Sequence, residues 1–189
     1  MTFSHLEEKQ IEREEIFEGH IVHLVRDRVL LPNGREATRE VCIHGGAVAV
    51  LPLLPSGEVL VERQFRYAHG RVLLEIPAGT LEKGEGADPL SAAKRELREE
   101  TGAVAKKYTD LGVLIPTPAV LNEKIHLYMA EDITFVDQSL DEDEFLEVER
   151  VPLAELYRAV LAGEIQDSKT QVAVMKAVHL RGRALGIEI

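Results

Sequence analysis

The stretch GTLEKGEGADPLSAAKRELREETGA, residues 79–103, holds the features around which the rest of the chain can be interpreted. Asp88 is a residue type that caps helices, and Pro89 suits the first helical position. Gly102 can end a helix in a left-handed turn. These signals predict a helix of roughly 13 residues, with Arg95 to Glu100 near its carboxyl end.

Three glutamates of this helix border its apolar stripe. On a wheel of about 100° per residue, Leu90, Ala93 and Leu97 form the stripe. Carboxylates so close together repel one another and resist burial, and a divalent metal would resolve that conflict. Mg²⁺ prefers oxygen ligands and bridges carboxylates to substrate phosphates. The glutamates are Glu96, Glu99 and Glu100.

A plainer interpretation of the same helix stays open at this point. The charges can form a solvated face on which Arg95 pairs with Glu99 at a spacing of four residues. Short acidic motifs produce many false positives, so the flanking sequence has to decide between the two interpretations.

With its flanks, the segment resembles the Nudix box of the Nudix hydrolases. That pattern is Gly, five residues, Glu, seven residues, then Arg-Glu-aliphatic-x-Glu-Glu-x-Gly-aliphatic. This chain departs from it because nine residues separate Glu85 from Arg95, and because the small Ala103 stands at the last aliphatic position. The extra two residues fall in the loop before the helix, so the spacing of the helical glutamates is unchanged. The other matching residues are Gly79, Glu96, Leu97, Glu99, Glu100 and Gly102.

Pro118 lies fifteen residues beyond Ala103, and a proline near that position marks the ADP-ribose pyrophosphatase branch of the family. Many relatives have glycine after this proline, whereas this chain has Ala119. Further similar stretches extend the resemblance from about residue 20 to residue 170. They read LPNGREATREV, GAVAVLP, VERQFRY, EIPAGTLE, DEDEFLEVERVPL and IQDSKT.

The resemblance implies metal-dependent hydrolysis of ADP-ribose to AMP and ribose 5-phosphate. It places Mg²⁺, or Mn²⁺, on Glu96, Glu99, Glu100 and the main-chain carbonyl of Ala78. The acidic loop DQSLDEDEFLE, residues 137–147, would supply a base or water-positioning group and a further metal ligand. The candidates are Glu142 and Glu144, whose roles stay interchangeable, although a charge run of this kind can also be a solvated loop.

The resemblance also implies contacts to the substrate. Arg39 and Arg66 are candidates for the diphosphate or adenine, Glu123 for the terminal ribose, and Pro118 lies in the substrate loop. Two alternatives remain: a Nudix pyrophosphatase for another nucleoside diphosphate sugar such as GDP-mannose, and a Nudix module that binds ADP-ribose without cleaving it. Turnover in Mg²⁺ distinguishes the enzyme from the binding module.

Composition limits the classes of partner. A net charge of −11 argues against general affinity for nucleic acid, which needs clustered Lys and Arg. The single cysteine, Cys42, cannot form an internal disulfide. The amino terminus lacks the apolar core of a signal peptide, and the apolar runs are too short to span a membrane. We therefore expect a cytoplasmic protein without nucleic-acid or membrane partners.

The expected fold class is α/β: a Nudix α/β/α sandwich with a mixed sheet over residues 46–189, preceded by a small antiparallel β subdomain over residues 1–45. Asn33-Gly34 between two strand-like runs predicts a hairpin in the subdomain. Two further helices are expected over 152–163 and 168–182. A hairpin of this size is marginal alone, and the resemblance implies a homodimer that exchanges its amino-terminal strands.

Overall fold

The computed structural model describes residues 3–82 and 84–187 and divides into two compact units. The first comprises Met1–Gly46 and Ile115–Glu123, and the second Ala47–Leu114 and Lys124–Ile189. The division after Gly46 lies one residue beyond the boundary suggested by the sequence. Residues 115–123 belong to the first unit although the segments before and after them belong to the second, and no local sequence signal predicts this.

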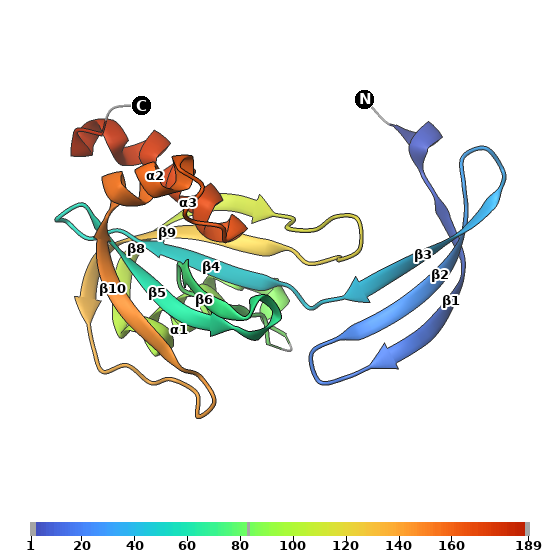
Figure 1. Cartoon of the computed structure of the whole chain (residues 1–189), viewed down its shortest axis with the longest axis horizontal. Helices are drawn as coiled ribbons and strands as arrows, with labels where there is room; N and C mark the ends of the chain where they lie inside the picture. Colours follow the sequence, from blue (N-terminus) through green and yellow to red (C-terminus); the bar gives the residue numbers. More distant parts are fainter. Residues whose placement is uncertain (1–2, 83, 188–189) are drawn as a thin grey trace. The chain divides into compact units, whose positions relative to one another are not determined.

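The first unit is built on a three-stranded antiparallel sheet in the order β1-β2-β3, after the short 3-10 helix η1 (Ser4–Leu6). Its strands are β1 (Lys9–Glu18), β2 (His23–Leu30) and β3 (Glu36–Ile43) (Figure 1). The predicted hairpin is confirmed: β2 pairs with β3, and Gly34 has a φ of 82°, which glycine adopts without strain.

Residues 115–123 attach to this unit through the end of β3. The Cys42 amide donates to the Val120 carbonyl at 2.8 Å, and the Asn122 amide donates to the Cys42 carbonyl at 3.3 Å. The Asn122 side chain also accepts from the His44 amide at 2.7 Å. The loop that contains Pro118 is therefore fixed to the β subdomain.

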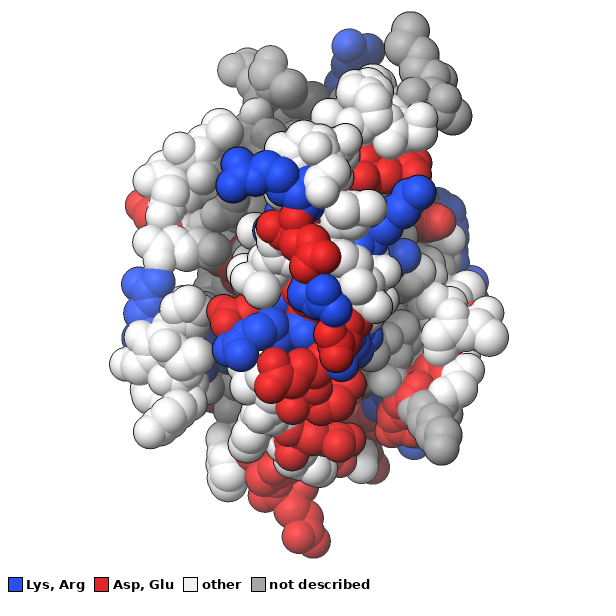
Figure 2. Space-filling model, turned by 90° about the vertical axis from the view of Figure 1, so that its right-hand side faces the viewer, with Lys and Arg blue, Asp and Glu red and all other residues white. Residues whose placement is uncertain are grey.

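Ion pairs between strands stabilise the small sheet. Arg28 binds Glu12 and Glu36, both at 2.9 Å, from the two neighbouring strands. The buried Asp27 forms a bidentate salt bridge with Arg13, at 2.7 and 2.8 Å. This contact lowers the pKa of Asp27. Figure 2 shows basic and acidic side chains next to one another across the middle of one face, and mainly acidic side chains toward its lower end.

The second unit contains two sheets. The mixed sheet has the order β7-β4-β9-β8, with β4 parallel to β9, and the antiparallel sheet has the order β10-β5-β6. The mixed sheet comprises β4 (Ala47–Pro52), β7 (Ala78–Thr80), β8 (Ala103–Leu114) and β9 (Ile125–Phe135). The other sheet comprises β5 (Glu58–Arg66), β6 (Arg71–Glu75) and β10 (Leu146–Pro152). The remaining elements are η2 (Tyr67–His69), η3 (Glu85–Ala87), α1 (Pro89–Thr101), α2 (Leu153–Leu161), α3 (Ser168–Arg181) and η4 (Gly182–Leu185).

Two apolar cores lie on opposite faces of β4, whose six residues are all buried. Val48 and Val50 pack with Leu97 of α1, whereas Leu51 packs with residues of α2 and α3. Helices therefore cover both faces of the mixed sheet, with α1 on one side and α2 and α3 on the other (Figure 1). This is the expected α/β/α arrangement.

The helix predicted from residues 79–103 is confirmed. It spans Pro89–Thr101, and Asp88 Oδ1 accepts from the Ser91 amide at 3.3 Å. Gly102 has a φ of 66° and donates its amide to the Arg98 carbonyl at 2.9 Å. The two extra residues of the box fall in the turn around η3, before the helix begins. Within the described part of the chain, no helix is long and apolar enough to cross a membrane.

Candidate active site

The helix α1 presents its glutamates at the edge of the core. Glu100 is 3% exposed, while Glu96 and Glu99 are partly buried. The buried positions Ala93 and Leu97 hold this side of the helix against the sheet. The apolar stripe therefore fixes how deeply each carboxylate lies.

The short strand β7 faces these carboxylates. The Ala78 amide donates to Glu100 Oε2 at 3.0 Å, which joins the strand to the last turn of α1. A Cβ atom at position 79 would overlap the carboxylate of Glu96. An alanine at this position would therefore force the carboxylate of Glu96 to move away from β7.

We expect Gly79→Ala to reduce kcat/KM by roughly 10²-fold, because the added methyl group displaces Glu96, and misplacement by about 1 Å costs on this scale. Gly86→Ala is the matched control: a Cβ there meets nothing within 4 Å, so activity should be retained. Steady-state kinetics with ADP-ribose and Mg²⁺ provides the measurement. Equal activity of the two variants would contradict the close approach.

Arg95 organises the outer side of the acidic face. It donates to Glu85 at 3.1 and 3.2 Å and to Glu99 at 3.0 Å, and it lies 2.9 Å from Glu96. The pairing with Glu99 considered in the plainer interpretation is thus present. Glu85 stays beside the helix despite the two-residue insertion, and its contact is to Arg95.

The acidic loop that follows β9 is attached to the carboxyl end of α1. The Ser139 amide donates to the Glu99 carbonyl at 3.0 Å, and the Gln138 side chain donates to the Glu100 carbonyl. These bonds satisfy carbonyls that a helix end leaves unpaired. The loop therefore begins directly at the residues that bear the helical carboxylates.

A polar cavity of about 210 Å³ lies between the loop, β7 and α1. Glu144 and Asp141 line it together with the three helical glutamates and Ala78. Glu142, the other loop candidate, is exposed and is not among the lining residues. The structure thus brings together one of the two loop candidates and all four candidate metal ligands.

Burial and mutual repulsion act on the carboxyl groups of this cavity. Burial, and next Glu62, raise the pKa of Glu100 to about 10. Burial also raises the pKa of Glu96 to about 7, against the lowering effect of Arg95. The pKa of Glu144 is raised by burial and by Asp141. The charged forms of these carboxyl groups are therefore disfavoured in a cavity whose lining residues include one cation, Arg95.

The chemistry of these donors fits a hard divalent cation, which takes carboxylate and carbonyl oxygens. In the described ranges 3–82 and 84–187, no three Asp, Glu, His or Cys side chains are already gathered as an ion-binding group. The reason is visible in the contacts: Arg95 holds Glu99 and lies against Glu96, and the Ala78 amide holds Glu100. Cation binding would replace these contacts.

We expect the metal-free protein to lose stability as pH rises from about 5 to 8. A carboxyl group with a raised pKa in the folded state stabilises the fold below its unfolded pKa of about 4.3, and that stability is lost as pH rises through the folded pKa. For Glu96 and Glu62 these values are about 7 and about 8. The melting temperature in EDTA should fall by at least ~5 °C, and excess Mg²⁺ should remove most of the fall. A melting temperature in EDTA that is flat or rising over this range would contradict the repulsion.

Arg66, the last residue of β5, belongs to a charge network with the buried residues Glu75 and Lys169. It donates to both oxygens of Glu75, at 2.7 and 2.8 Å, and Glu75 also accepts from Lys169. Lys169 binds Asp167 at 3.0 Å as well. Glu75 thus fixes the guanidinium plane of Arg66, the sequence candidate for the diphosphate.

The other candidates for substrate contact belong to the first unit. Arg39 donates to Glu8 at 2.5 Å and to the Thr38 carbonyl at 2.9 Å. Glu123 lies 3.5 Å from His44, and Pro118 lies in the loop attached to β3. Their proposed roles rest on the sequence resemblance.

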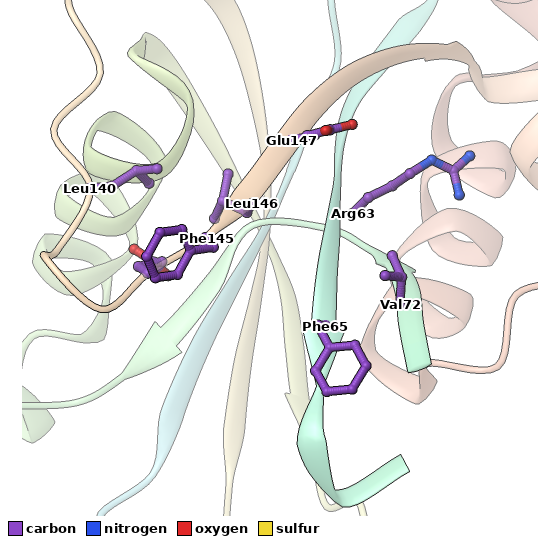
Figure 3. A pocket seen from close by; sticks show the side chains of 8 residues that line it. Arg63, Phe65, Val72, Leu140, Phe145, Leu146 and Glu147 are labelled. Atoms are coloured by element: carbon purple, nitrogen blue, oxygen red, sulfur yellow. The ribbon is translucent and has the colours of Figure 1, made fainter. Parts of the chain in front are cut away.

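A second cavity of about 540 Å³ also contains Glu144 in its lining. Figure 3 shows it between β5, β6 and the chain leading into β10, with Phe65, Val72 and Phe145 on its walls. These three side chains are 55%, 53% and 80% exposed. Glu144 therefore lies at the junction of a polar cavity and an apolar one.

Sequence reasoning did not single out several residues of this region as functional. Asp141 and Ser139 lie in the acidic loop, where the sequence pattern does not distinguish the functional positions from the others. Glu62 had a signal, because the alternation in β5 places it on the polar row that begins inside the strand. Glu75 and Lys169 are 94 residues apart, so no local pattern joins them.

Comparison with known families finds two matching models. Residues 43–172 match the NUDIX domain, and residues 8–42 match the nucleoside diphosphate sugar hydrolase N-terminal domain. The two models meet near the division between the units of the structure.

Individual proteins are also similar over most of the chain. ADP-ribose pyrophosphatase of Bacillus subtilis (strain 168) is 43% identical over 171 residues, covering 89% of this chain and 91% of that protein. Methanol dehydrogenase activator of Bacillus methanolicus is 41% identical over 170 residues, covering 89% and 91%. A crystal structure described as ADP compounds hydrolase superposes with a TM-score of 0.82 at 21% identity, covering 94% and 95%, and shows the same fold.

Proposed function

Because this chain belongs to the Nudix family, we propose that it hydrolyses the diphosphate bond of ADP-ribose in a metal-dependent reaction that yields AMP and ribose 5-phosphate. The observation that carries the proposal is the polar cavity in which Glu96, Glu99, Glu100 and Glu144 converge. The similarity to an ADP-ribose pyrophosphatase supports the choice of substrate.

The candidate ligands of a divalent cation are Glu96, Glu99, Glu100 and the Ala78 carbonyl. When bound, such a cation neutralises charge on the diphosphate and lowers the pKa of a bound water. We assign Mg²⁺ because carboxylate-rich sites that also bind phosphates suit it, and Mn²⁺ as the alternative ion. Burial of Glu100 and repulsion among the carboxylates support a site that needs an external cation.

Glu144 is our candidate for the base that accepts the proton of the attacking water. It lines the cavity, whereas Glu142 does not, and burial raises its pKa toward the range in which a carboxylate can accept a proton. Water would attack one phosphorus atom, and the bond from that phosphorus to the bridging oxygen would break. Arg66 would bind the anionic diphosphate, and its hydrogen bonds to Glu75 support a fixed orientation of the guanidinium group.

We also propose that the chain works as a homodimer that exchanges its amino-terminal strands. Every residue of β1 is exposed, including Ile11, Ile16 and Phe17. A three-stranded sheet with so little buried apolar surface gains stability by packing against another chain. Light scattering on the purified protein tests this assembly.

The test of function is a substrate panel with Mg²⁺ or Mn²⁺. ADP-ribose, GDP-mannose, ADP-glucose, NADH and diadenosine polyphosphates are incubated with the protein, and released phosphomonoester is measured after phosphatase treatment. We expect ADP-ribose to be cleaved fastest. A faster reaction with another sugar nucleotide would agree with the proposed mechanism but contradict the proposal that ADP-ribose is the preferred substrate. Binding of ADP-ribose without turnover of any compound would instead favour the binding module.

A further inference from the structure

Glu62 is a buried carboxylate, and one of its oxygens has no hydrogen-bond partner among the described residues. It lies on β5 and is 3% exposed. That oxygen is Oε1, which is itself buried. Leaving a buried charged acceptor unpaired is costly, so native structures usually provide a partner for it.

Comparison with its neighbour on the next strand shows what is missing. Glu62 and Glu75 are directly paired in the register of β5 and β6, and both are buried. Glu75 receives hydrogen bonds from Arg66 and Lys169, which together outweigh burial and lower its pKa to about 2. Arg66 and Lys169 thus direct their hydrogen bonds to Glu75, and they act on Glu62 only through longer-range attraction.

Two carboxyl groups that line the polar cavity act electrostatically on Glu62. Besides burial, repulsion by Glu144 raises its pKa to about 8, and Glu62 in turn raises the pKa of Glu100. Glu144 and Glu100 both line the cavity. Glu62 therefore lies near both carboxyl groups, and it belongs to β5 of the β10-β5-β6 sheet.

We propose that Glu62 is a further carboxylate of the cation-binding set, which engages the bound divalent cations from the sheet side. The inference rests on the proposed function, because it assumes that the cavity binds Mg²⁺ or Mn²⁺. A cation would bring positive charge to the Glu62 oxygen that has no hydrogen-bond partner among the described residues, and carboxylate oxygen is a preferred donor for both ions. The helical glutamates then account for only part of the binding set.

The test measures ion binding without substrate. Mn²⁺ is titrated into the full chain, and the free ion is followed by its electron paramagnetic resonance signal. We expect Glu62→Gln to bind Mn²⁺ at least about tenfold more weakly than the wild type, or to bind one ion fewer. Glu58→Gln is the matched control, because Glu58 lies on the same strand and face, four residues away, outside the cavity. It should bind Mn²⁺ as the wild type does.

Thermal unfolding in EDTA separates ion binding from folding. Glu62→Gln and Glu62→Leu both remove an unpaired buried carboxyl group, so their metal-free melting temperatures should equal or exceed that of the wild type. Mg²⁺ should raise these temperatures less than it raises that of the wild type. Two variants with different side chains keep the test valid if one of them folds poorly.

Two outcomes would overturn the proposal in distinguishable ways. If both Glu62 variants bind Mn²⁺ like the wild type while Glu100→Gln loses it, the cation site stands and Glu62 is held by a proton or a buried water instead. If Glu100→Gln also binds Mn²⁺ with unchanged affinity, the cation site itself is wrong, and the proposed function loses its main support.

Discussion

Glu100→Gln is expected to lower kcat/KM for ADP-ribose by roughly 10³-fold or more, the scale on which removing a group that stabilises transition-state charge acts. Glu100 is buried at the base of the polar cavity. Glutamine keeps the shape of the side chain, and its oxygen can still accept from the Ala78 amide. The substitution therefore removes the negative charge and leaves the packing in place.

The effect on stability should have the opposite sign. Glu62, Glu96 and Glu144 all raise the pKa of Glu100, which means that its charged form is repelled by three neighbours. Neutral glutamine removes that repulsion, so the melting temperature in EDTA should equal or exceed that of the wild type at pH 8. Loss of activity together with retained stability identifies a charge required for function.

The control for this prediction is Glu155→Gln, on the exposed side of α2. It removes the same charge from the chain but lies outside the cavity, so activity should stay within about twofold of the wild type, as for surface changes in general. Wild-type activity in Glu100→Gln would remove the acidic cavity from the mechanism. A large fall in its metal-free melting temperature would show that Glu100 is needed for the fold.

The parts of the fold that the sequence predicted well are those set by local chemistry. Asp88, Pro89 and Gly102 bound the helix because capping and left-handed turns depend on neighbouring residues only. Asn33-Gly34 predicted its hairpin for the same reason. The limits of the strands around the helix depend less on local chemistry, as β8 shows, since it begins at Ala103 directly after the glycine that ends the helix. Its first half alternates weakly and is stabilised by pairing with β9.

The candidate site was predictable as far as it lies on one helix. Glu96, Glu99 and Glu100 follow from spacing, but their surroundings depend on contacts between distant segments. The attachment of the acidic loop to the end of α1 joins Ser139 to Glu99 across forty residues, and only the fold reveals it. The positions of Glu142 and Glu144 are a similar case: the sequence makes the two equivalent, whereas only Glu144 is among the residues that line the cavity.

The buried network around Glu75 should carry the largest single contribution of an ion pair to stability. We expect Glu75→Gln to destabilise the protein by about 3 kcal/mol or more, because it leaves Lys169 buried without its full counter-charge. Lys169→Met should also destabilise, since it removes one of the cations that hold Glu75. Chemical denaturation at pH 7 in the presence of Mg²⁺ provides the free energies of unfolding.

The double variant Glu75→Gln, Lys169→Met separates an ion pair from simple loss of packing. If the two charges stabilise each other, the double variant should lose clearly less than the sum of the single losses, with a coupling energy of about 1–3 kcal/mol. Additive losses would contradict a direct pair and indicate that Arg66 alone satisfies Glu75.

The low pKa of Glu75 also predicts how stability changes with pH. A carboxylate with a folded pKa of about 2 stabilises the fold at pH values above its unfolded pKa, and that stability disappears as pH falls from about 4 through 2. Because this trend opposes the one expected from Glu96 and Glu62, stability in EDTA should be greatest near pH 5. Stability that stays level between pH 5 and 8 would contradict the repulsion of Glu96 and Glu62, because the contribution of Glu75 is constant over that range.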